Sequence, residues 1–517
     1  MEQSVDKEVT STIRTQMNQM DIDKTLVLNP AYYLRNDIHR AIIGTFEFSE
    51  MSSGQYEPHF LRPIHPVIAQ LLSFFSGDGK TRGHIMHDIA EYFHLSNEQV
   101  VEIIRPMINN NNPLIKEFEG TMMVLPNNLL IESSGMKRRE TYKPQDFLIE
   151  GDLDLKTIRL YKPVHAVLEL TMRCLTDCIY CYADKRKHNN DILPTDIAIK
   201  FIKEAKINGF VDIEINGGEV MSHPGIDSIL LELASNGYYC LISTKIPIQE
   251  DRIKFLKNIG MTRVQISLDS LNPIKASTLL HVDSNYLPRL KQTMCLLDQY
   301  EFKWQINTVL TKYNCNIHDI KELINELSKY NHVKGIKLSP IGYPMYKSPD
   351  TFEQLHPSAE QLSSVRQYVD SIRSENCNYW ITMADEETED NYKCKKWESF
   401  ERRSSCTANQ KAFNVLPDGK VTICEELYWH PSFIIGDITE NSILEIWKSE
   451  KAKKLFFVQN DYFSKQSTCY SCEKILDCRC NKGVCWKMVI MAYGDEHWDY
   501  PDPRCPKAPL PYNKFYL

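Results

Sequence analysis

The stretch Leu168-Glu-Leu-Thr-Met-Arg-Cys-Leu-Thr-Asp-Cys-Ile-Tyr-Cys-Tyr182 is the most informative part of this chain of 517 residues. It spaces Cys174, Cys178 and Cys181 so that three thiols can face one metal cluster. A cubane with four irons has four corners, so three close cysteines leave one iron open for a ligand that is not protein. The run 166–171 is apolar and strand-like, which places the cysteines on the loop at the carboxyl end of a strand. In a barrel of strands and helices, that end is the reactive one.

This spacing resembles the signature of the radical SAM superfamily, CxxxCxxC with an aromatic residue, here Tyr180, directly before the third cysteine. The resemblance implies a [4Fe–4S] cluster whose open iron chelates S-adenosylmethionine (SAM). Three thiols at short spacing with a distant fourth ligand also fit a structural zinc site. The position of the cysteines directly after a strand favours the cluster over zinc.

The composition indicates a globular protein of several domains. The length exceeds what one core organises, and sixteen cysteines argue for metal ligation in a reducing compartment. The chain has no run of eighteen apolar residues and no signal peptide, so we expect a cytoplasmic protein without membrane contact. A net charge of -8 gives no general electrostatic footprint for nucleic acid.

Strand-like and helix-like runs alternate after the cysteine loop. This order predicts an α/β fold with a parallel, right-handed array of βα units, and the resemblance implies the partial (β/α)6 barrel of radical SAM enzymes. The expected strands lie near 165–172, 212–217, 238–244, 263–269, 303–311 and 335–340. The expected helices lie near 195–208, 224–236, 249–259, 285–299, 317–330 and 358–374.

The second expected strand ends in Gly217, Gly218 and Glu219. Two glycines at a strand end allow close backbone approach to a ligand, and the glutamate adds a carboxylate. An ordinary turn has the same composition, but the segment lies one strand after the cysteine loop. It resembles the GGE motif, which implies that it binds the amino group of the methionine moiety of SAM.

Polar residues also interrupt the fourth and fifth expected strands. Ser267 and Asp269 share one face by the period of two residues, and the resemblance implies a ribose or carboxylate contact for Ser267. Capping or loop structure explains Asp269 equally well. Asn307 on the fifth strand is expected to face the site. Many relatives place an arginine for the SAM carboxylate in the stretch that reads Ser277-Thr-Leu-Leu-His281 here, so the carboxylate partner stays open.

Nine of the sixteen cysteines follow residue 390, which indicates further metal sites. Their pattern resembles the SPASM extension, which carries two auxiliary [4Fe–4S] clusters. The resemblance implies three [4Fe–4S] clusters in all. The expected ligands of the outer auxiliary cluster are Cys469, Cys472, Cys478 and Cys505. The expected ligands of the inner one are Cys406, Cys424 and a cysteine after Cys478, with Cys394 as the fourth.

The cysteine after Cys478 is ambiguous, because the family pattern expects it at the position of Lys482. Either Cys480 or Cys485 must substitute. We favour Cys485, because residues 481–484 supply a glycine-containing turn that can bring it to the cluster. The remaining cysteine is then either a buried thiol, a fourth ligand or a donor of a hydrogen atom.

The N-terminal segment predicts a small winged helix. Residues 25–34 and 40–46 read as a hairpin, and Ser96 with Gln99 forms a capping box for the last of three helices. The helices are expected near 65–76, 82–93 and 97–108, followed by a second β segment at 114–131.

A winged helix often binds DNA, but the third helix is more acidic than basic here, which disfavours phosphate contact. The order of elements instead resembles the PqqD-like peptide recognition elements, which bind a leader peptide as an added strand at a sheet edge. The expected domains are a flexible segment 1–24, a recognition domain 25–135, a linker 136–160, a radical SAM barrel 161–390 and a SPASM domain 391–517.

Together these resemblances imply an enzyme that crosslinks a ribosomally made precursor peptide through a 5′-deoxyadenosyl radical, forming a thioether or a carbon–carbon bond. The expected partners are the precursor peptide with its leader and an electron donor such as flavodoxin or ferredoxin. An alternative is a peptide epimerase that uses Cys480 or Cys485 as the hydrogen donor. Formylglycine formation needs no leader-binding domain and is disfavoured. An alternative of another class is a zinc-stabilised winged-helix binding or regulatory protein.

Overall fold

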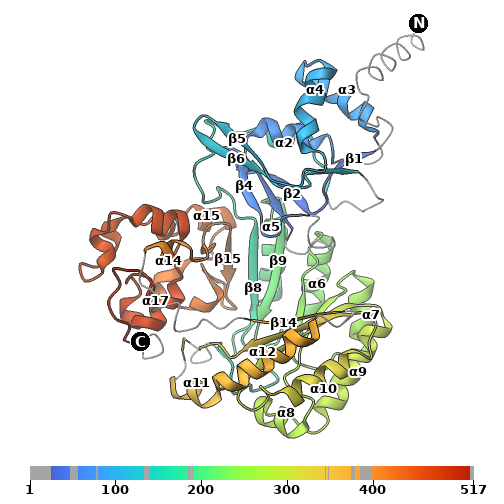
Figure 1. Ribbon diagram of the computed structural model, residues 1–517, viewed down its shortest axis with the longest axis vertical. Helices are drawn as coiled ribbons and strands as arrows, with labels where there is room; N and C mark the ends of the chain where they lie inside the picture. Colours follow the sequence, from blue (N-terminus) through green and yellow to red (C-terminus); the bar gives the residue numbers. More distant parts are fainter. Residues whose placement is uncertain are drawn as a thin grey trace. The chain divides into compact units, whose positions relative to one another are not determined.

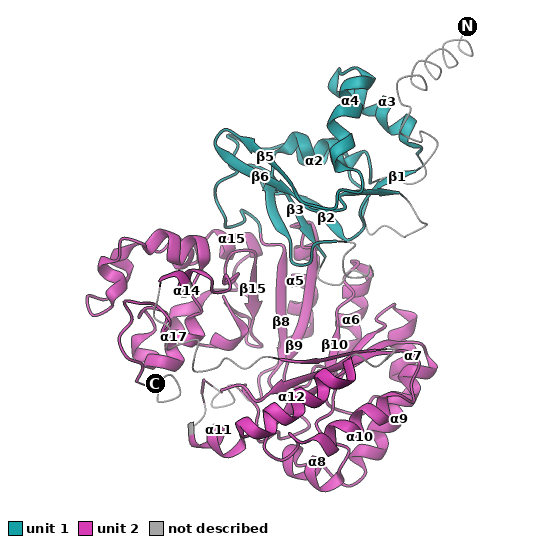
Figure 2. Ribbon diagram, viewed as in Figure 1, with its two compact units in different colours: residues 1–162 teal, residues 163–517 magenta. Residues whose placement is uncertain are grey.

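The computed structural model divides into two compact units, Met1–Lys162 and Pro163–Leu517 (Figure 2). Each unit has its own hydrophobic core. The structure describes residues 25–46, 56–76, 80–132, 140–183, 188, 190–343, 345–346, 349–373, 379–384 and 397–512. The expected flexible segment 1–24 and Cys394 lie outside the described residues.

The first unit contains a three-stranded antiparallel sheet of order β2-β3-β4, three helices and the hairpin β5-β6 (Figure 1). The expected first hairpin is only partly correct, because β2 and β3 form it while β1 pairs with β7. Asn29 turns the chain between β1 and β2, and its Oδ1 accepts from the backbone N–H of Ala31 at 2.9 Å. The strands are β1 (Leu26–Leu28), β2 (Tyr32–Asn36), β3 (Ala41–Thr45), β4 (Leu61–Ile64), β5 (Leu114–Phe118), β6 (Thr121–Leu125) and β7 (Leu130–Glu132).

Three helices follow the sheet of the first unit: α2 (Pro66–Ser73), α3 (Arg82–Phe93) and α4 (Asn97–Ile104). The predicted capping box of α4 is confirmed, because the side chains of Ser96 and Gln99 bond reciprocally to each other's backbone. The α-helix ends earlier than expected and continues as a short 3-10 turn, Arg105–Met107, because Pro106 lacks the N–H that the next α-helical hydrogen bond needs.

A buried ion pair ties the chain from residue 154 to 162 onto this sheet. Arg40 Nε donates to Asp37 Oδ2 at 2.8 Å, and both side chains are almost fully buried. The guanidinium also donates to the carbonyl oxygens of Thr157 and Arg159, and Asp37 accepts from the backbone N–H of Lys162. The segment expected to be a linker therefore packs on the first unit from residue 140 onward, with Phe147 inside its core.

The second unit is built on two sheets and their helices (Figure 1). All six expected strands are present, as β8 (His165–Thr171), β9 (Asp212–Gly217), β10 (Ile242–Thr244), β11 (Arg263–Ser267), β12 (Lys303–Leu310) and β13 (Val333–Pro340). Within the described chain they do not form one continuous sheet. One sheet has the order β10-β11-β12-β13-β14 and is parallel throughout, and the unexpected last strand is β14 (Trp380–Met383).

The other sheet has the order β17-β16-β15-β8-β9 and joins the two regions that we expected as separate domains. The strands from the cysteine-rich region are β15 (Ala412–Val415), β16 (Lys420–Thr422) and β17 (Ile434–Asp437). The strand β15 pairs parallel with β8, and β8 pairs parallel with β9 on its other side. Without β15, β8 would be an edge strand with unpaired backbone groups, which explains why the cysteine-rich region belongs to the same compact unit.

Helices cover these sheets close to where they were expected. They are α5 (Thr195–Ile207), α6 (Ile226–Ser235), α7 (Glu250–Asn258), α9 (Tyr286–Gln299), α10 (Ile317–Leu327) and α12 (Ala359–Arg373). Helices that we did not expect are α8 (Pro273–Leu280) and α11 (Pro349–Leu355). The cysteine-rich region adds α14 (Trp397–Glu401), α15 (Ile443–Lys448), α16 (Glu450–Phe456) and α17 (Trp486–Tyr493).

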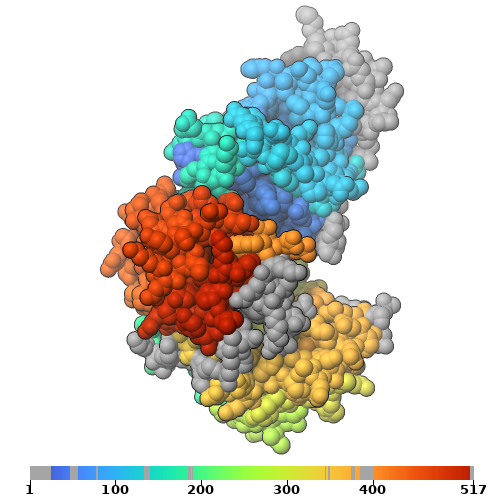
Figure 3. All heavy atoms as spheres, turned by 60° about the vertical axis from the view of Figure 1, so that its left-hand side comes forward, coloured from blue at the N-terminus to red at the C-terminus, as the bar shows by residue number. Residues whose placement is uncertain are grey.

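The cysteine-rich region shares its core with the strands and helices before it. Phe413 on β15 contacts Phe201 and Phe210 with ring centroids 6.0 Å and 6.1 Å apart. At the surface, the region forms one continuous lobe in orange to red (Figure 3). None of the helices in the described part of the chain combines the length and the apolar character that crossing a bilayer requires.

We expect Arg40→Met to lower the free energy of unfolding of full-length protein by about 3–5 kcal/mol, because it removes the cation that is hydrogen-bonded to the buried Asp37 carboxylate. Urea unfolding measures the change. The double variant Asp37→Asn/Arg40→Met should recover part of this loss, and Arg62→Met, at an exposed position of β4, should change stability little. Equal stability of the single and double variants would contradict a stabilising role for the pair.

Candidate active site

A cavity of about 460 Å³ lies at the carboxyl ends of the strands of the second unit. The cysteine loop after β8 lines it, and so do the ends of β9, β11 and β12. The residues singled out in the sequence that line this cavity are Cys174, Cys178, Tyr180, Cys181, Gly217, Gly218, Glu219, Ser267 and Asn307. The structure therefore brings together residues separated by more than a hundred positions.

The cysteine loop is held by the end of α8. The backbone N–H groups of Asp177 and Ile179 donate to the last carbonyl oxygens of α8, those of Leu280 and Leu279, at 3.1 Å and 3.0 Å. These carbonyls have no partner inside their own helix, so the loop satisfies them. Residues 277–281, where the expected arginine is absent, thus form the helix end that supports the cysteine loop. Its αL residue, His281, ends the helix.

Tyr180, the aromatic residue of the cysteine motif, belongs to a buried polar network. Its hydroxyl donates to Asp269 Oδ2 and accepts from Lys245 Nζ at 2.6 Å, and Lys245 Nζ lies 3.1 Å from Asp269 Oδ2. Burial opposes the charge of Lys245, but the carboxylate of Asp269 and the thiolate of Cys178 outweigh it and raise the lysine pKa.

The carboxylate oxygens of Asp269 accordingly find their hydrogen-bond partners within the protein. Its Oδ1 accepts from the backbone N–H of Val309 at 2.9 Å, its side chain is almost fully buried, and it does not line the cavity. This geometry matches the loop-structure alternative for Asp269. Sequence reasoning missed Lys245, although a lysine directly after a short apolar strand, at the carboxyl end of the array, was a usable signal.

The two glycines bring the end of β9 against the end of β8. Gly217 has φ +128°, and a Cβ there would lie 2.3 Å from the carbonyl oxygen of Thr171. A Cβ on Gly218 would lie 2.2 Å from the carbonyl oxygen of Arg173. No side chain fits at either position, so only glycine permits this approach.

Glu219 lines the cavity but is strongly bound by the protein. Its Oε1 accepts from Thr244 Oγ1 and the backbone N–H of Met221, and its Oε2 accepts from the backbone N–H of Lys245. Burial raises its pKa, and these hydrogen bonds oppose the increase. The carboxylate is therefore fixed in position at the cavity wall.

Ser267 and Asn307 are direct neighbours on the parallel strands β11 and β12. Both line the cavity, and Asn307 Oδ1 is buried without a hydrogen-bond partner. A buried acceptor without a donor is costly, so a bound ligand with an N–H or O–H group fits this position. The pair therefore suits a polar cofactor such as SAM.

A wall of the cavity that the sequence analysis did not anticipate is acidic. Glu169 on β8 is 2% exposed, and its Oε1 has no hydrogen-bond partner. Glu425 accepts from Asn216 Nδ2 at 2.9 Å, and burial raises the pKa of both carboxyls. Glu426 is paired with Lys487 at 2.5 Å. In the sequence, the position of Glu169 inside the apolar run of β8 could have predicted an acidic residue at this wall.

Three of the later cysteines form a first group beside this wall. Burial raises the pKa of Cys424 to about 12, and the charges of Cys485 and Cys406 act in the same direction. Gly483 lies directly against Cys406, since a Cβ on the glycine would meet that residue at 2.9 Å. The turn before Cys485 therefore brings it to Cys406 and Cys424. Cys480 lies apart, with its Sγ 4.0 Å from the carbonyl oxygen of Val458.

The four cysteines expected to hold the outer cluster form a second group. Cys469, Cys472, Cys478 and Cys505 line one small cavity. Burial raises the pKa of Cys505 to about 11, and the other three thiolates add to the increase. Thiols with raised pKa values release protons when they bind a metal.

The spacing of the sulfurs argues against zinc. Thiolates about 2.3 Å from a tetrahedral zinc ion lie within about 3.8 Å of one another. Among the described residues, no three cysteine sulfurs lie within 4.8 Å of one another. A cubane is larger than a single ion and separates its ligands more widely, so the arrangement fits iron–sulfur clusters better.

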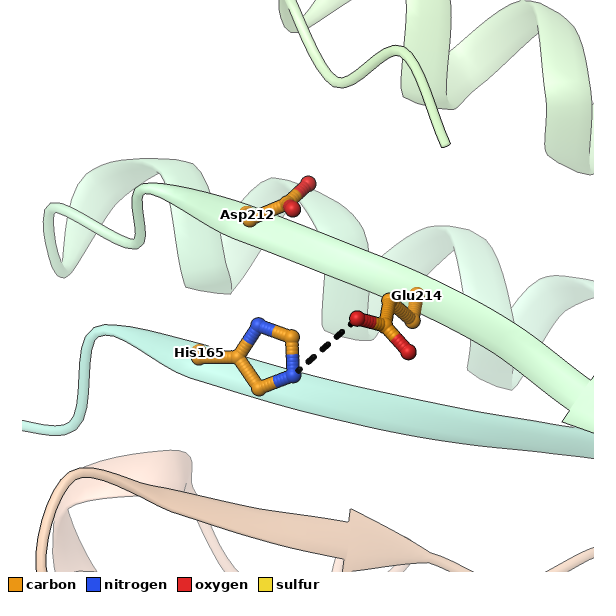
Figure 4. Close-up of side chains that lie close together, drawn as sticks. All are labelled: His165, Asp212 and Glu214. Atoms are coloured by element: carbon orange, nitrogen blue, oxygen red, sulfur yellow. Dashed lines mark ion pairs between the residues drawn. The ribbon is translucent and has the colours of Figure 1, made fainter. Parts of the chain in front are cut away.

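A separate group of possible metal ligands lies at the amino ends of β8 and β9. Figure 4 shows His165 and Glu214 facing each other, with His165 Nε2 3.9 Å from Glu214 Oε1, and Asp212 beside them. Their ligand atoms lie within 4.8 Å of one another. None of the three lines the cavity, so this group has no part in the site.

Comparison with known proteins agrees with this geometry. Residues 168–327 match the radical SAM superfamily, and residues 406–473 match the SPASM iron-sulfur cluster-binding domain. The PqqA peptide cyclase of Methylorubrum extorquens (strain PA1) is 23% identical over 355 residues, which cover 67% of this chain and 86% of that protein.

Two further proteins are similar. The antilisterial bacteriocin subtilosin biosynthesis protein AlbA of Bacillus subtilis is 25% identical over 320 residues, covering 59% of this chain and 63% of AlbA. The crystal structure of Streptococcus suis SuiB bound to S-adenosylmethionine has a TM-score of 0.59 at 15% identity, covering 93% of this chain and 99% of SuiB. The fold of SuiB thus extends over nearly the whole chain.

We expect Gly218→Ala to weaken SAM binding to the iron–sulfur-loaded protein at least tenfold, because its Cβ would push the end of β9 away from Arg173. Equilibrium binding of SAM measures the effect. Gly342→Ala is the matched control, because Gly342 lines the same cavity and a Cβ there meets nothing within 4 Å. Equal SAM affinity of the two variants would exclude a role for this close approach.

The grouping of the cysteines predicts different iron contents for two serine variants. With three [4Fe–4S] clusters the protein holds about twelve irons. Cys485→Ser should lower this number to about eight, because Cys485 lies with Cys406 and Cys424, whereas Cys480→Ser should leave it unchanged. Iron and acid-labile sulfide analysis distinguishes them, and the reverse pattern would assign the ligand role to Cys480.

Proposed function

We propose that this chain, which carries a radical SAM domain followed by a SPASM domain, is an enzyme that installs an intramolecular crosslink, a thioether or a carbon–carbon bond, in a ribosomally made precursor peptide. The observation that carries the proposal is the single cavity shared by the cysteine loop, the polar residues of β11 and β12, and the acidic wall that leads to Cys424. A substrate in this cavity would contact the cysteine loop and the glutamates that directly follow Cys424.

The residues present fit the expected cofactors. Cys174, Cys178 and Cys181 would hold the first [4Fe–4S] cluster, and Ser267 and Asn307, with its unsatisfied Oδ1, would bind SAM. SAM and a reduced cluster together supply a 5′-deoxyadenosyl radical, which removes a hydrogen atom from the peptide. The electron for this reduction comes from a donor such as flavodoxin or ferredoxin.

The protein's own residues position the peptide and manage its proton. Closing a crosslink removes two hydrogens: one leaves as an atom, the other as a proton and an electron. Glu169 and Glu425 line the same cavity as Ser267 and Asn307, and burial raises the pKa of both carboxyls, so a carboxylate there would bind the released proton more strongly than one in water. The cysteines of the two later groups would hold auxiliary clusters, which would take up the electron.

The first unit is proposed to bind the leader of the precursor peptide. Its sheet ends at β2 and β4, and a strand edge can bind an extended peptide through backbone hydrogen bonds. The similarity to the PqqA peptide cyclase, and a second crystal structure of SuiB in which it is bound to precursor peptide SuiA, support a peptide substrate for this chain. Tethering the leader raises the effective concentration of the segment to be modified.

Crosslinking is favoured over the two alternatives. An epimerase needs a thiol at the substrate, but Cys480, which among the described cysteines after residue 400 lies outside both auxiliary groups, does not line the cavity. A zinc-stabilised binding protein needs sulfurs closer together than those of the described cysteines.

Co-expression with the short peptides encoded beside the gene, in deuterated water, tests the proposal. We expect the mass of one peptide to fall by about 2 Da for each crosslink, because two hydrogens are removed. A gain of about 1 Da would instead identify epimerisation with a solvent-exchanged hydrogen. Unchanged masses for all peptides, with the clusters shown to be intact, would contradict the proposed function.

A further inference from the structure

Two buried arginines flank the four cysteines of the outer group. Arg403 follows α14 and is 8% exposed, and Arg479 lies between Cys478 and Cys480 and is 5% exposed. Arginine is rarely buried unless a negative charge compensates it. The groups around the two arginines therefore identify the negative charge that compensates them.

Arg403 is directed at Cys478. Its Nη2 lies 3.4 Å from Cys478 Sγ and donates to the carbonyl oxygens of Cys478 and Gly483 at 3.0 Å and 2.9 Å. The guanidinium packs over the ring of Phe400 at 3.9 Å, and its Nη1 donates to the carbonyl oxygen of the same residue. The side chain is thus fixed with one N–H toward the sulfur.

Arg479 is directed at Cys469 in the same way. Its Nη2 lies 3.4 Å from Cys469 Sγ and donates to the carbonyl oxygen of Tyr500 at 2.8 Å. The guanidinium lies between the rings of Phe463 and Trp486, at 5.0 Å and 4.6 Å. Its Nε and Nη1 are buried without a hydrogen-bond partner.

Neither arginine has a carboxylate partner within the described part of the chain. The carboxylate that lines the same small cavity, Asp502, is ion-paired with Arg504 at 2.8 Å. The compensating negative charge available to Arg403 and Arg479 is therefore that of the cysteine sulfurs. Four thiolates around a [4Fe–4S] core carry a net negative charge, and reduction increases it by one.

We infer that Arg403 and Arg479 raise the reduction potential of the [4Fe–4S] cluster held by Cys469, Cys472, Cys478 and Cys505, and so make it the electron-accepting end of the protein. Buried positive charge and N–H···S hydrogen bonds both stabilise the reduced cluster more than the oxidised one. The cation that acts on the inner group is Lys487 beside Cys485, and it is already paired with Glu426 at 2.5 Å. The outer cluster therefore has a higher potential than the inner one.

This inference rests on the proposed function for its place in the reaction. Crosslink closure releases one electron and one proton from the peptide. A cluster held by the outer cysteines would take up the electron, and a carboxylate of the cavity wall would accept the proton. The outer cysteines line a different cavity from Cys174, so an acceptor of raised potential there would take the electron away from the site where SAM must next be cleaved.

Potentiometric EPR of the full-length, iron–sulfur-loaded protein tests the inference without any peptide. Cys174→Ala/Cys178→Ala/Cys181→Ala removes the signal of the first cluster, and Cys505→Ser identifies the signal of the outer one. Arg403→Gln and Arg479→Gln should each lower the ratio of reduced to oxidised outer cluster about tenfold at a fixed potential, which equals a shift of about 59 mV for one electron. Arg403→Lys and Arg479→Lys should restore most of the potential.

Arg402→Gln is the matched control, because Arg402 is exposed and adjacent in sequence. Glutamine variants that keep full iron and sulfide with an unchanged potential would overturn the inference. If the glutamine variants lose iron, the protein with both arginines intact still tests the inference. In that protein, an outer cluster that is reduced at a lower potential than the inner one, or an outer site without a cluster, would overturn it. Because no peptide is used, these outcomes are independent of whether a crosslink is formed.

Discussion

The pairing of β8 on both of its edges is the constraint on which the site depends. On one edge, β9 can approach only because Gly217 and Gly218 leave room for the backbone of Thr171 and Arg173. On the other edge, β15 brings the cysteine-rich region into the same sheet. The loop that leaves β8 carries three cysteines, so both pairings place other functional groups around them. The cavity is the result, and it is lined by the cysteine loop, by polar residues of β11 and β12, and by Glu169, Glu425 and Glu426.

Buried acidic and basic side chains of this unit gather at different places, the carboxyls at the cavity and two arginines at the outer cysteines. Burial raises the pKa of Glu169 and Glu425 at the cavity, which favours the uptake of a proton there. Arg403 and Arg479 concentrate positive charge at the outer cysteines, where an electron can be held. Lys245 is ion-paired with Asp269 and donates to Tyr180, so it stabilises the cysteine loop. Its positive charge is neutralised by Asp269 and does not compensate the glutamates of the cavity.

Local periodicity was sufficient to locate the six strands β8–β13 and the helices that follow them, because the hydrophobic period of a strand or helix depends only on residues that are neighbours in the sequence. The cysteine spacing likewise pointed to residues that line one cavity. Sequence could not reveal that β15 pairs with β8, since the two strands are far apart in the chain and each pattern is compatible with several partners. The same holds for Glu169 with Glu425, and for Tyr180, Lys245 and Asp269, which only the tertiary fold brings together.

Removal of a peptide hydrogen atom by the adenosyl radical is the central step of this account, and isotope transfer tests it most directly. The loaded protein, SAM, a reductant and a fully deuterated precursor peptide are incubated together, and the mass of the released 5′-deoxyadenosine is measured. We predict that 5′-deoxyadenosine gains about 1 Da, because one deuterium moves from the peptide to the adenosyl carbon. Unlabelled 5′-deoxyadenosine, formed alongside a modified peptide, would contradict a radical that acts directly on the peptide.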